Sequence, residues 1–536
     1  MVVPELRPWR AAGPQVERIA NAVRPRLARA ATAAGPRVAR LTRAVGPGLV
    51  RIAHLPRPRT VRTWQYTAGA ATAGLALAAG VVTASGPWDA NGQRTAERDR
   101  AAAQERSGGA DHGTPGGSAG APLPAPSAAP VLAGLDSSAG TVSTKKAPPG
   151  GKALTSVLGP LLGVPELGGS RAAVVVDVAT GKRIYSTDAT KALAPASTTK
   201  IATAVAALSA LGPDHRFTTR AALEPDTREL VLVGGGDPTL TAHAVTDGWA
   251  GLRTLATGTA AALKKRGIRQ ITLSYDTTLY SGPALHPIGV NENLAPVSAL
   301  SADEGRTDDS SRGPAPRVSD PAADAAGKFA GFLRAAGIRT TPPGPSKATG
   351  RATTLATVTS PPLSDVVERM LTNSDNDIAE ALARQTALAS GRPADFGGGA
   401  GAVAAQLGKL GLPMSGAAFH DGSGLSRDDR LTADLLTALL VKAGDPAGPG
   451  LRPVLTGLPV GGFTGTLATR YTDGAGGFVR AKTGTLTGVN TLAGTVVDRD
   501  GRLLVFAFLA SGTTNPLQAQ AALDKAATAL AGCGCR

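Results

Sequence analysis

Cysteine and histidine are scarce in this 536-residue chain, which contains two cysteines and six histidines. Both cysteines, Cys533 and Cys535, stand at the C-terminal end, so a disulfide scaffold and a four-cysteine zinc site are excluded. A catalytic cysteine inside a folded domain is not expected either. The histidines show no metal-ligand spacing, and we predict neither a metal site nor a cofactor.

Acidic residues are nearly absent from the first part of the chain, and this explains most of its net charge of +16. Residues 1–63 contain 13 arginines, no lysine and two glutamates, a net charge of +11. Residues 86–150 are balanced, and residues 151–536 keep only +5. A basic nucleic-acid groove on the large C-terminal part is therefore not expected.

Residues 64–85 carry no charge, and the 20 residues 66–85 are long enough to cross a bilayer. Positive charge flanking a span favours the cytoplasmic side, which places the arginine-rich arm, residues 1–63, inside. We expect a single-pass protein of the cell membrane whose C-terminal part is extracytoplasmic. A cleaved signal peptide, which would release a secreted protein, is the alternative.

The arm and the segment after the span do not read as folded domains. The arm repeats every 11 residues, with Pro14, Pro25, Pro36 and Pro47 in register. It could form basic amphipathic turns on anionic lipid or remain a disordered arm. Residues 86–150 are rich in Gly, Ala, Pro and Ser and are interpreted as a linker.

Ser197 and Lys200 stand at the start of an apolar, helix-like run that ends before Gly212. Side chains three residues apart lie on one helix face, so this spacing brings the hydroxyl and the amine together. A serine is a weak nucleophile until a neighbour takes its proton, and a buried lysine can do so if its pKa is lowered. The pair predicts nucleophilic catalysis, although S-x-x-K alone is a common sequence.

Two further clusters follow in the chain, Ser374-Asp375-Asn376 and Lys482-Thr483-Gly484-Thr485. The order S-x-x-K, S-D-N, K-T-G is the set that penicillin-binding proteins and related β-lactamases use. The chain from residue 153 onward resembles the D-alanyl-D-alanine carboxypeptidase/endopeptidase family, the low-molecular-mass penicillin-binding proteins of class C. Further matches are 234–238 (GGGDP), 296–301 (PVSALS) and 421–426 (DGSGLS).

The resemblance implies a serine DD-peptidase that cleaves peptidoglycan stem peptides and is acylated by β-lactams. Ser197 would be the nucleophile, Lys200 its general base and Ser374 a proton relay. Asn376 and Lys482 complete the implied catalytic set, and Thr483, Gly484 and Thr485 would bind substrate. Asn376 would hydrogen-bond a peptide carbonyl, and Lys482 with Thr483 and Thr485 would hold the terminal carboxylate. The backbone N–H groups of Ser197 and Thr485 would form the oxyanion hole.

The expected fold is α/β (α+β): the serine β-lactamase-like DD-peptidase fold, with an antiparallel sheet between helices. Residues 151–214 and 361–536 would form the catalytic domain, and residues 215–360 an inserted region. The insert is shorter than in the best-known class C members. Patterning predicts strands at 171–178, 229–233, 268–273, 492–497 and 503–509, and helices at 252–265, 323–335 and 515–530.

Two other functions remain open. A class A β-lactamase uses a deacylating Glu between S-D-N and K-T-G, but Glu380, just after S-D-N, is the last Glu of the chain, and no E-x-x-L-N follows. A membrane-tethered penicillin sensor or wall-binding protein is the non-enzymatic alternative. The segment 421–424 is interpreted as a shaped turn, and Asp375 as structural at a helix start.

Overall fold

A computed structural model describes residues 151–246, 248–472 and 474–533. The arm, the expected span and the linker lie outside these residues. Among the described helices, none is long and apolar enough to cross a membrane.

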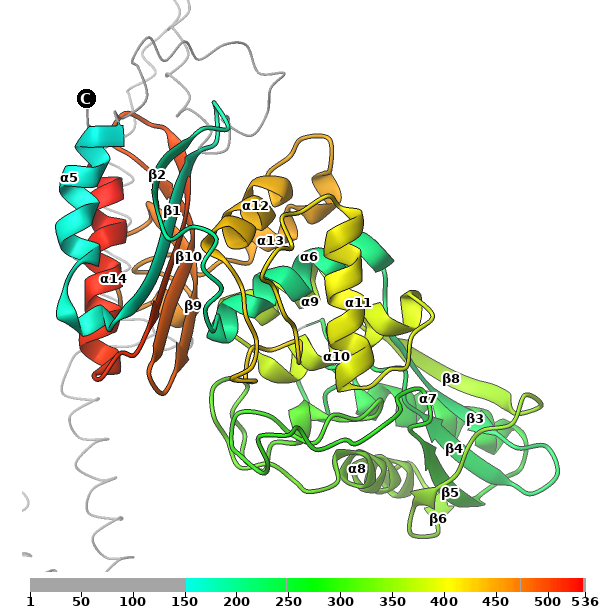
Figure 1. The fold of residues 1–536 in the computed structure, drawn as a ribbon. Helices are drawn as coiled ribbons and strands as arrows, with labels where there is room; N and C mark the ends of the chain where they lie inside the picture. The colour runs from blue at the N-terminus through cyan, green and yellow to red at the C-terminus, as the bar shows by residue number, and fades with distance from the viewer. Residues whose placement is uncertain (1–150, 247, 473, 534–536) are drawn as a thin grey trace, which may run out of the picture. The chain divides into compact units, whose positions relative to one another are not determined.

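The two ends of the described chain meet in one antiparallel sheet of five strands (Figure 1). Strand β1 (Ser170–Asp177) pairs with β11 (Leu503–Ser511), so that Val174 lies opposite Ala507. The sheet order is β2 (Arg183–Thr187), β1, β11, β10 (Val489–Val497) and β9 (Val479–Leu486). The expectation of an antiparallel sheet built from both chain ends is confirmed.

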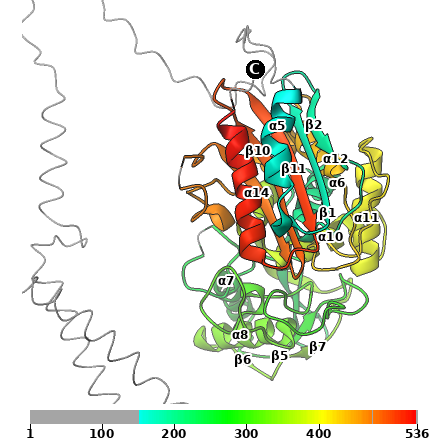
Figure 2. The same ribbon diagram turned by 60° about the vertical axis from the view of Figure 1, so that its left-hand side comes forward.

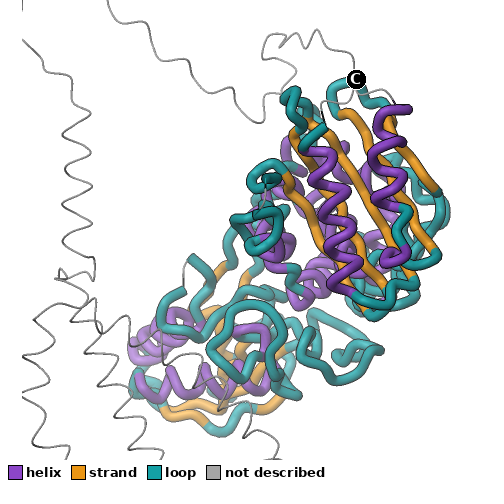
Figure 3. The backbone as a smooth tube through the Cα atoms, turned by 90° about the vertical axis from the view of Figure 1, so that its left-hand side faces the viewer, coloured by secondary structure: helices purple, strands orange, loops and turns teal. Residues whose placement is uncertain are grey.

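Helices cover both faces of this sheet, which explains why its strands read as continuous apolar runs. Helices α5 (Gly151–Leu162) and α14 (Pro516–Ala531) lie side by side on one face (Figures 2 and 3). In β1, Val175 faces them, whereas its neighbour Val174 faces α6 (Thr199–Leu211) and α12 (Ala433–Ala443). Because side chains alternate along a strand, both faces need apolar residues. Cys533, two residues after the end of α14, is buried in the apolar core between the sheet and helices α5 and α14.

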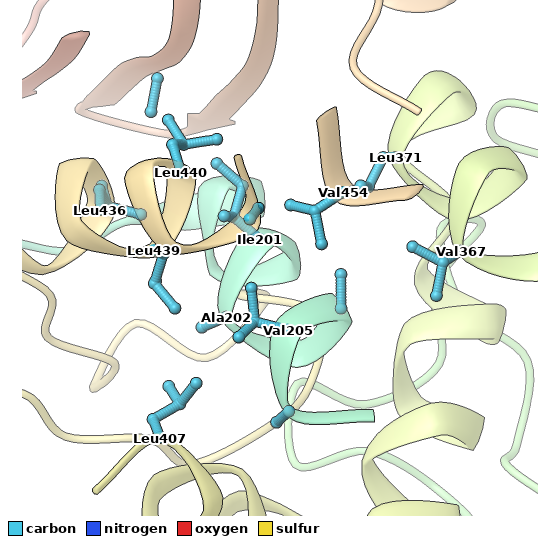
Figure 4. Close-up of a cluster of buried hydrophobic side chains, with 14 of the residues drawn as sticks. Ile201, Ala202, Val205, Val367, Leu371, Leu407, Leu436, Leu439, Leu440 and Val454 are labelled. Carbon is cyan, nitrogen blue, oxygen red and sulfur yellow. The ribbon is translucent and has the colours of Figure 1, made fainter. Parts of the chain in front are cut away.

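The larger core surrounds α6, the helix that begins beside Ser197 (Figure 4). Ile201 and Val205 of α6 pack with Leu436 and Leu440 of α12, and all are fully or almost fully buried. Each such side chain stabilises the fold by roughly 1.5–3 kcal/mol. The remaining helices of this layer are α9 (Leu363–Asn373), α10 (Asn376–Ala389), α11 (Phe396–Lys409) and α13 (Pro453–Thr456).

The residues between the first and second motifs form a second, mixed sheet with its own apolar core. Its strands are β3 (Thr218–Leu223), β4 (Glu229–Val233), β5 (Gln270–Asp276), β6 (Arg339–Thr340), β7 (Gly344–Pro345) and β8 (Thr353–Thr359). Helices α7 (Leu252–Lys265) and α8 (Pro321–Ala335) complete it, close to their expected bounds. Since β3 pairs with β8, the chain leaves and re-enters the catalytic part at neighbouring points.

Candidate active site

Ser197 lies in a short 3₁₀ turn, Ala196–Thr198, that leads directly into α6. Ala196 has a φ of 48°, a left-handed conformation that costs a residue with a Cβ about 1–3 kcal/mol. Two hydroxyls hold the turn, because Thr198 Oγ1 and Thr491 Oγ1 donate to Pro195 O at 2.7 and 2.8 Å. Ser197 is thus fixed at a helix start, as predicted.

Lys200 is fully buried one turn later, and its ammonium group has three hydrogen-bond acceptors. Its Nζ lies 3.1 Å from Ser197 Oγ, 2.6 Å from Asn376 Oδ1 and 2.7 Å from Ser423 O. Burial lowers the pKa of Lys200 to about 8, against the opposing effect of nearby carboxylates, chiefly Asp421. A lysine with such a pKa can lose its proton near neutral pH and act as a base.

The S-D-N cluster forms the junction between α9 and α10. Ser374 ends α9 in the left-handed conformation, with φ 59°. The Asp375 side chain accepts from Ile378 N at 3.0 Å and caps α10, which confirms its expected place at a helix start. Asn376 donates through Nδ2 to Asn293 O at 2.9 Å, which fixes its amide oxygen toward Lys200.

The K-T-G cluster lies on β9 beside these residues. Lys482 is fully buried, and its Nζ donates to Ser374 Oγ at 2.8 Å and to Thr483 O at 2.8 Å. Burial, followed by the charge of Lys200, lowers the pKa of Lys482 well below its ordinary value. Thr483 Oγ1 bonds Thr466 Oγ1 at 3.1 Å, and Thr485 is exposed. The three motifs therefore meet in one place, joined by the Lys200–Asn376 and Lys482–Ser374 hydrogen bonds.

Gly484 is where β9 passes closest to the turn that carries Ser197. A Cβ at this position would lie 2.1 Å from Thr491 Oγ1 and 2.7 Å from Pro195 O. We expect Gly484→Ala to push the strand and the turn apart, which should lower the free energy of unfolding by ~1–3 kcal/mol. Acylation of Ser197 should slow by up to ~100-fold, because the strand carries one wall of the site.

Thermal melting and the rate of labelling by a fluorescent penicillin would measure the two effects. Gly169→Ala is a suitable control, because no atom lies within 4 Å of its added Cβ and its φ is not positive. If Gly484→Ala matched this control in both measurements, the close approach of β9 to the Ser197 turn would matter neither for stability nor for acylation.

Several neighbours of the site stand outside the three motifs. Asp421 is buried and accepts from Gly424 N and Ser426 N, both at 2.6 Å, so the expected shaped turn is present. Its Gly424 has φ 82° and approaches Ala196 O so closely that a Cβ would lie 2.0 Å away. The turn also contacts the lysine of the first motif, because Ser423 O accepts a hydrogen bond from Lys200 Nζ. The D-G-S-G sequence was the available signal for it.

The inserted region also contributes to the site wall. Asn293 O holds Asn376, and Ala295 N donates to Asp377 at 3.0 Å. His286 Nε2 lies 3.0 Å from Asp421 Oδ2, and both side chains are buried. These residues carry no motif, so only the fold shows that they lie beside the nucleophile.

A nucleophilic serine with a buried lysine base, beside a second serine–lysine pair, defines an active-site serine enzyme that works by acyl transfer. The chain belongs to the D-Ala-D-Ala carboxypeptidase 3 (S13) family, whose sequence model matches residues 154–312 and 304–530. It is 38% identical to carboxypeptidase DacB of Mycolicibacterium smegmatis, over 77% of this chain and 90% of that protein. It is 36% identical to carboxypeptidase Rv3627c of Mycobacterium tuberculosis, over the same shares.

The fold is similar to that of penicillin-binding protein 4 (dacB) from Haemophilus influenzae, with a TM-score of 0.57 and 24% identity over 70% of this chain and 97% of that one. The expectation of an α/β DD-peptidase fold agrees with this likeness. Family membership confirms the expected activity class, a serine-type D-Ala-D-Ala peptidase.

Proposed function

We propose that this protein is a DD-carboxypeptidase that trims the D-Ala-D-Ala end of peptidoglycan stem peptides through an acyl-enzyme on Ser197. The observation that carries the proposal is the 3.1 Å contact between Ser197 Oγ and the buried Lys200 Nζ. The names of the two mycobacterial relatives, both carboxypeptidases, favour release of D-Ala over cleavage of cross-links.

In the first half-reaction, neutral Lys200 takes the proton of Ser197 as the oxygen attacks the carbonyl carbon of the penultimate D-Ala. The backbone N–H groups of Ser197 and Thr485 stabilise the oxyanion. Ser374, bonded to Lys482, then delivers a proton to the leaving amine, and free D-Ala departs. Water then attacks the ester carbonyl and gives a proton to Ser374, while the ammonium of Lys200 returns its proton to Ser197. The shortened stem peptide leaves as a carboxylic acid, and both serines are restored.

Substrate recognition follows from the charge and hydrogen-bonding groups around the serine. The terminal carboxylate needs a cation and hydroxyl donors, which Lys482, Thr483 and Thr485 supply. A carboxylate beside Lys482 would also restore the proton that burial disfavours. Asn376 offers an amide to the peptide carbonyl. A β-lactam, which carries a carboxylate next to a reactive amide carbonyl, would acylate Ser197 by the same route.

The place of action is a separate proposal. The arginine-rich arm before the uncharged segment 64–85, together with a cell-wall substrate, favours a catalytic part outside the membrane and tethered to it. Extraction of membranes with alkaline carbonate would test this: the full chain should stay with the membrane pellet, and release into the supernatant would indicate a cleaved leader.

The full chain should be incubated with purified muropeptides and its products followed by mass spectrometry. Free D-Ala, with pentapeptides shortened to tetrapeptides, is the expected result. Conversion of cross-linked dimers to monomers would instead indicate an endopeptidase. If neither product formed but penicillin still acylated the protein, a sensor would be favoured. Rapid turnover of penicillin would indicate a β-lactamase.

A further inference from the structure

A group of buried acids lies directly behind Lys200, outside the three motifs. Glu380 of α10 is 1% exposed, and it follows Asn376 by four residues, on the same helix face. Asp421 and Asp429 are fully buried as well. Removing a carboxylate from water is costly, so this group calls for an explanation beyond packing.

Glu380 is bound to the same short loop that Lys200 touches. Its Oε1 accepts from Ser423 N at 2.8 Å and from Gly422 N at 3.0 Å. The carbonyl of Ser423 in turn accepts from Lys200 Nζ at 2.7 Å. One residue therefore gives its N–H to Glu380 and its C=O to the catalytic lysine. The Glu380 carboxylate therefore fixes the position of the Ser423 carbonyl.

The loop is also pressed against α10, which leaves it little freedom to move. A Cβ on Gly422 would meet Ala379 O and the Ala383 side chain, both at 2.7 Å. Thr203 Oγ1, from α6, donates to Gly422 O at 2.6 Å. The loop is thus held by packing against α10, by the Thr203 hydroxyl and by the carboxylate of Glu380.

The other ionisable groups near Glu380 each have polar partners of their own. His286 Nδ1 accepts from Ile288 N at 3.2 Å, and its Nε2 lies 3.0 Å from Asp421 Oδ2. Burial and the neighbouring Asp421 raise the pKa of Asp429 to about 9, which keeps that acid protonated and Asp421 ionised. Arg384, on the same helix, donates to the backbone carbonyls of Ser281, Pro283 and Ala394.

Lys200 itself faces four carboxylates and one amine. Asp421, Glu380, Asp375 and Asp377 favour its charged form, and Lys482 is the nearby cation. Asp375 and Asp377 already interact with the arginines of the insert, among them Arg317, which lies 3.1 Å from Asp377. Glu380 has no such cation within ion-pair distance among the described residues. Its charge acts on Lys200 and also on Arg384 of the same helix.

We propose that Glu380 is a positioning residue for the acylation step. It holds the Ser423 carbonyl on Lys200, and its negative charge adds to that of Asp421 in retaining the proton on Lys200, so that it shifts the pH at which the lysine becomes a free base. The proposal rests on Lys200 being the general base, as argued above.

The direction of the effect follows from the two groups. Burial raises the pKa of Glu380 to about 7, below the value of about 8 for Lys200. The two backbone N–H groups that donate to Glu380, those of Gly422 and Ser423, favour its ionised form. Because a negative neighbour stabilises the ammonium form, removing that charge should lower the pKa of Lys200 and let acylation begin at lower pH.

Two substitutions in the full chain separate charge from position. Glu380→Gln keeps an oxygen that can accept from Ser423 N but removes the charge. Glu380→Asp keeps the charge but is one methylene too short to reach the loop. Glu368→Gln is the matched control. It makes the same chemical change in a side chain that is hydrogen-bonded to Thr456, away from the site.

The measurement is the second-order rate of acylation by a fluorescent penicillin between pH 5.5 and 10, with thermal melting of each variant. For Glu380→Gln we expect the acid limb to move down by about one pH unit, with the high-pH plateau within about threefold of the unmodified protein. For Glu380→Asp we expect an unmoved limb and a plateau about tenfold lower. Glu368→Gln should overlay the unmodified protein.

The proposal would be overturned if Glu380→Gln left the limb in place or moved it upward. Equal scaling of the whole profile in both Glu380 variants, with matching losses of melting temperature, would also overturn it, because that is a structural effect alone. Failure of the proposed function is a different result, since the unmodified protein itself would then show no acylation at any pH.

Discussion

Replacing Ser197 by alanine should abolish acyl-enzyme formation and slow D-Ala release by ~10⁴-fold or more. Ser197 Oγ is the hydroxyl that Lys200 contacts, whereas the neighbouring Thr198 and Thr203 hydroxyls are buried and donate to backbone carbonyls. The fold should survive, because Lys200 keeps Asn376 and Ser423 as acceptors. Intact-protein mass spectrometry after incubation with benzylpenicillin measures the adduct, and thermal melting measures the fold.

The informative control is Ser374→Ala. Ser374 also contacts a lysine through its side-chain hydroxyl, which lies 2.8 Å from Lys482 Nζ. If Ser374 relays protons, this variant should still form the adduct, but slowly, because attack does not require the relay. A full adduct on Ser197→Ala together with none on Ser374→Ala would reverse the two assignments.

The local motifs were readable from the sequence because their geometry is set by short spacings. A spacing of three positions from Ser197 to Lys200 places both on one helix face, and the structure joins them at 3.1 Å. Asp375 was predicted at a helix start and caps α10. The bounds of α7 match the pattern because its buried residues recur at helical spacing between a glycine and two lysines.

What could not be read depends on contacts across long stretches of chain. Helix α11 contains a run of glycines, Gly397 to Gly399, and such a sequence favours a turn until packing against α10 stabilises a helix. The pairing of β3 with β8 joins segments more than a hundred residues apart. Glu380 was informative in the sequence only as an argument against a class A β-lactamase. Its contact with the Ser423 loop depends on a fold that brings residues 380 and 423 together.

The same reasoning applies to the insert, whose contribution to the site was not predicted. Asn293 and His286 reach the site through a backbone carbonyl and an imidazole ring, two groups with no sequence signature. They tie the insert to Asn376 and to the Asp421 turn. The insert is therefore part of the active-site wall, and its sequence constrains catalysis even where it carries no motif.

Replacing Lys200 by methionine should lower the high-pH plateau of the acylation rate by ~10³- to 10⁴-fold. In the unmodified protein the rate should rise as pH passes about 8, because the folded-state pKa of Lys200 is lowered to that value and only the neutral amine accepts a proton. Methionine has a similar length and no proton to exchange, so the pH-dependent limb should disappear. Lys200→Arg should behave alike, since a guanidinium is not deprotonated in this range.

The second lysine makes this assignment testable. Lys482 also has a lowered pKa, so the pH profile alone does not tell the two amines apart. Their contacts do: Lys200 touches the nucleophile, whereas Lys482 touches Ser374. Lys482→Met should therefore weaken binding of ligands that carry a carboxylate but leave the limb near pH 8. If the limb vanished in Lys482→Met and persisted in Lys200→Met, the base would be Lys482, acting through Ser374.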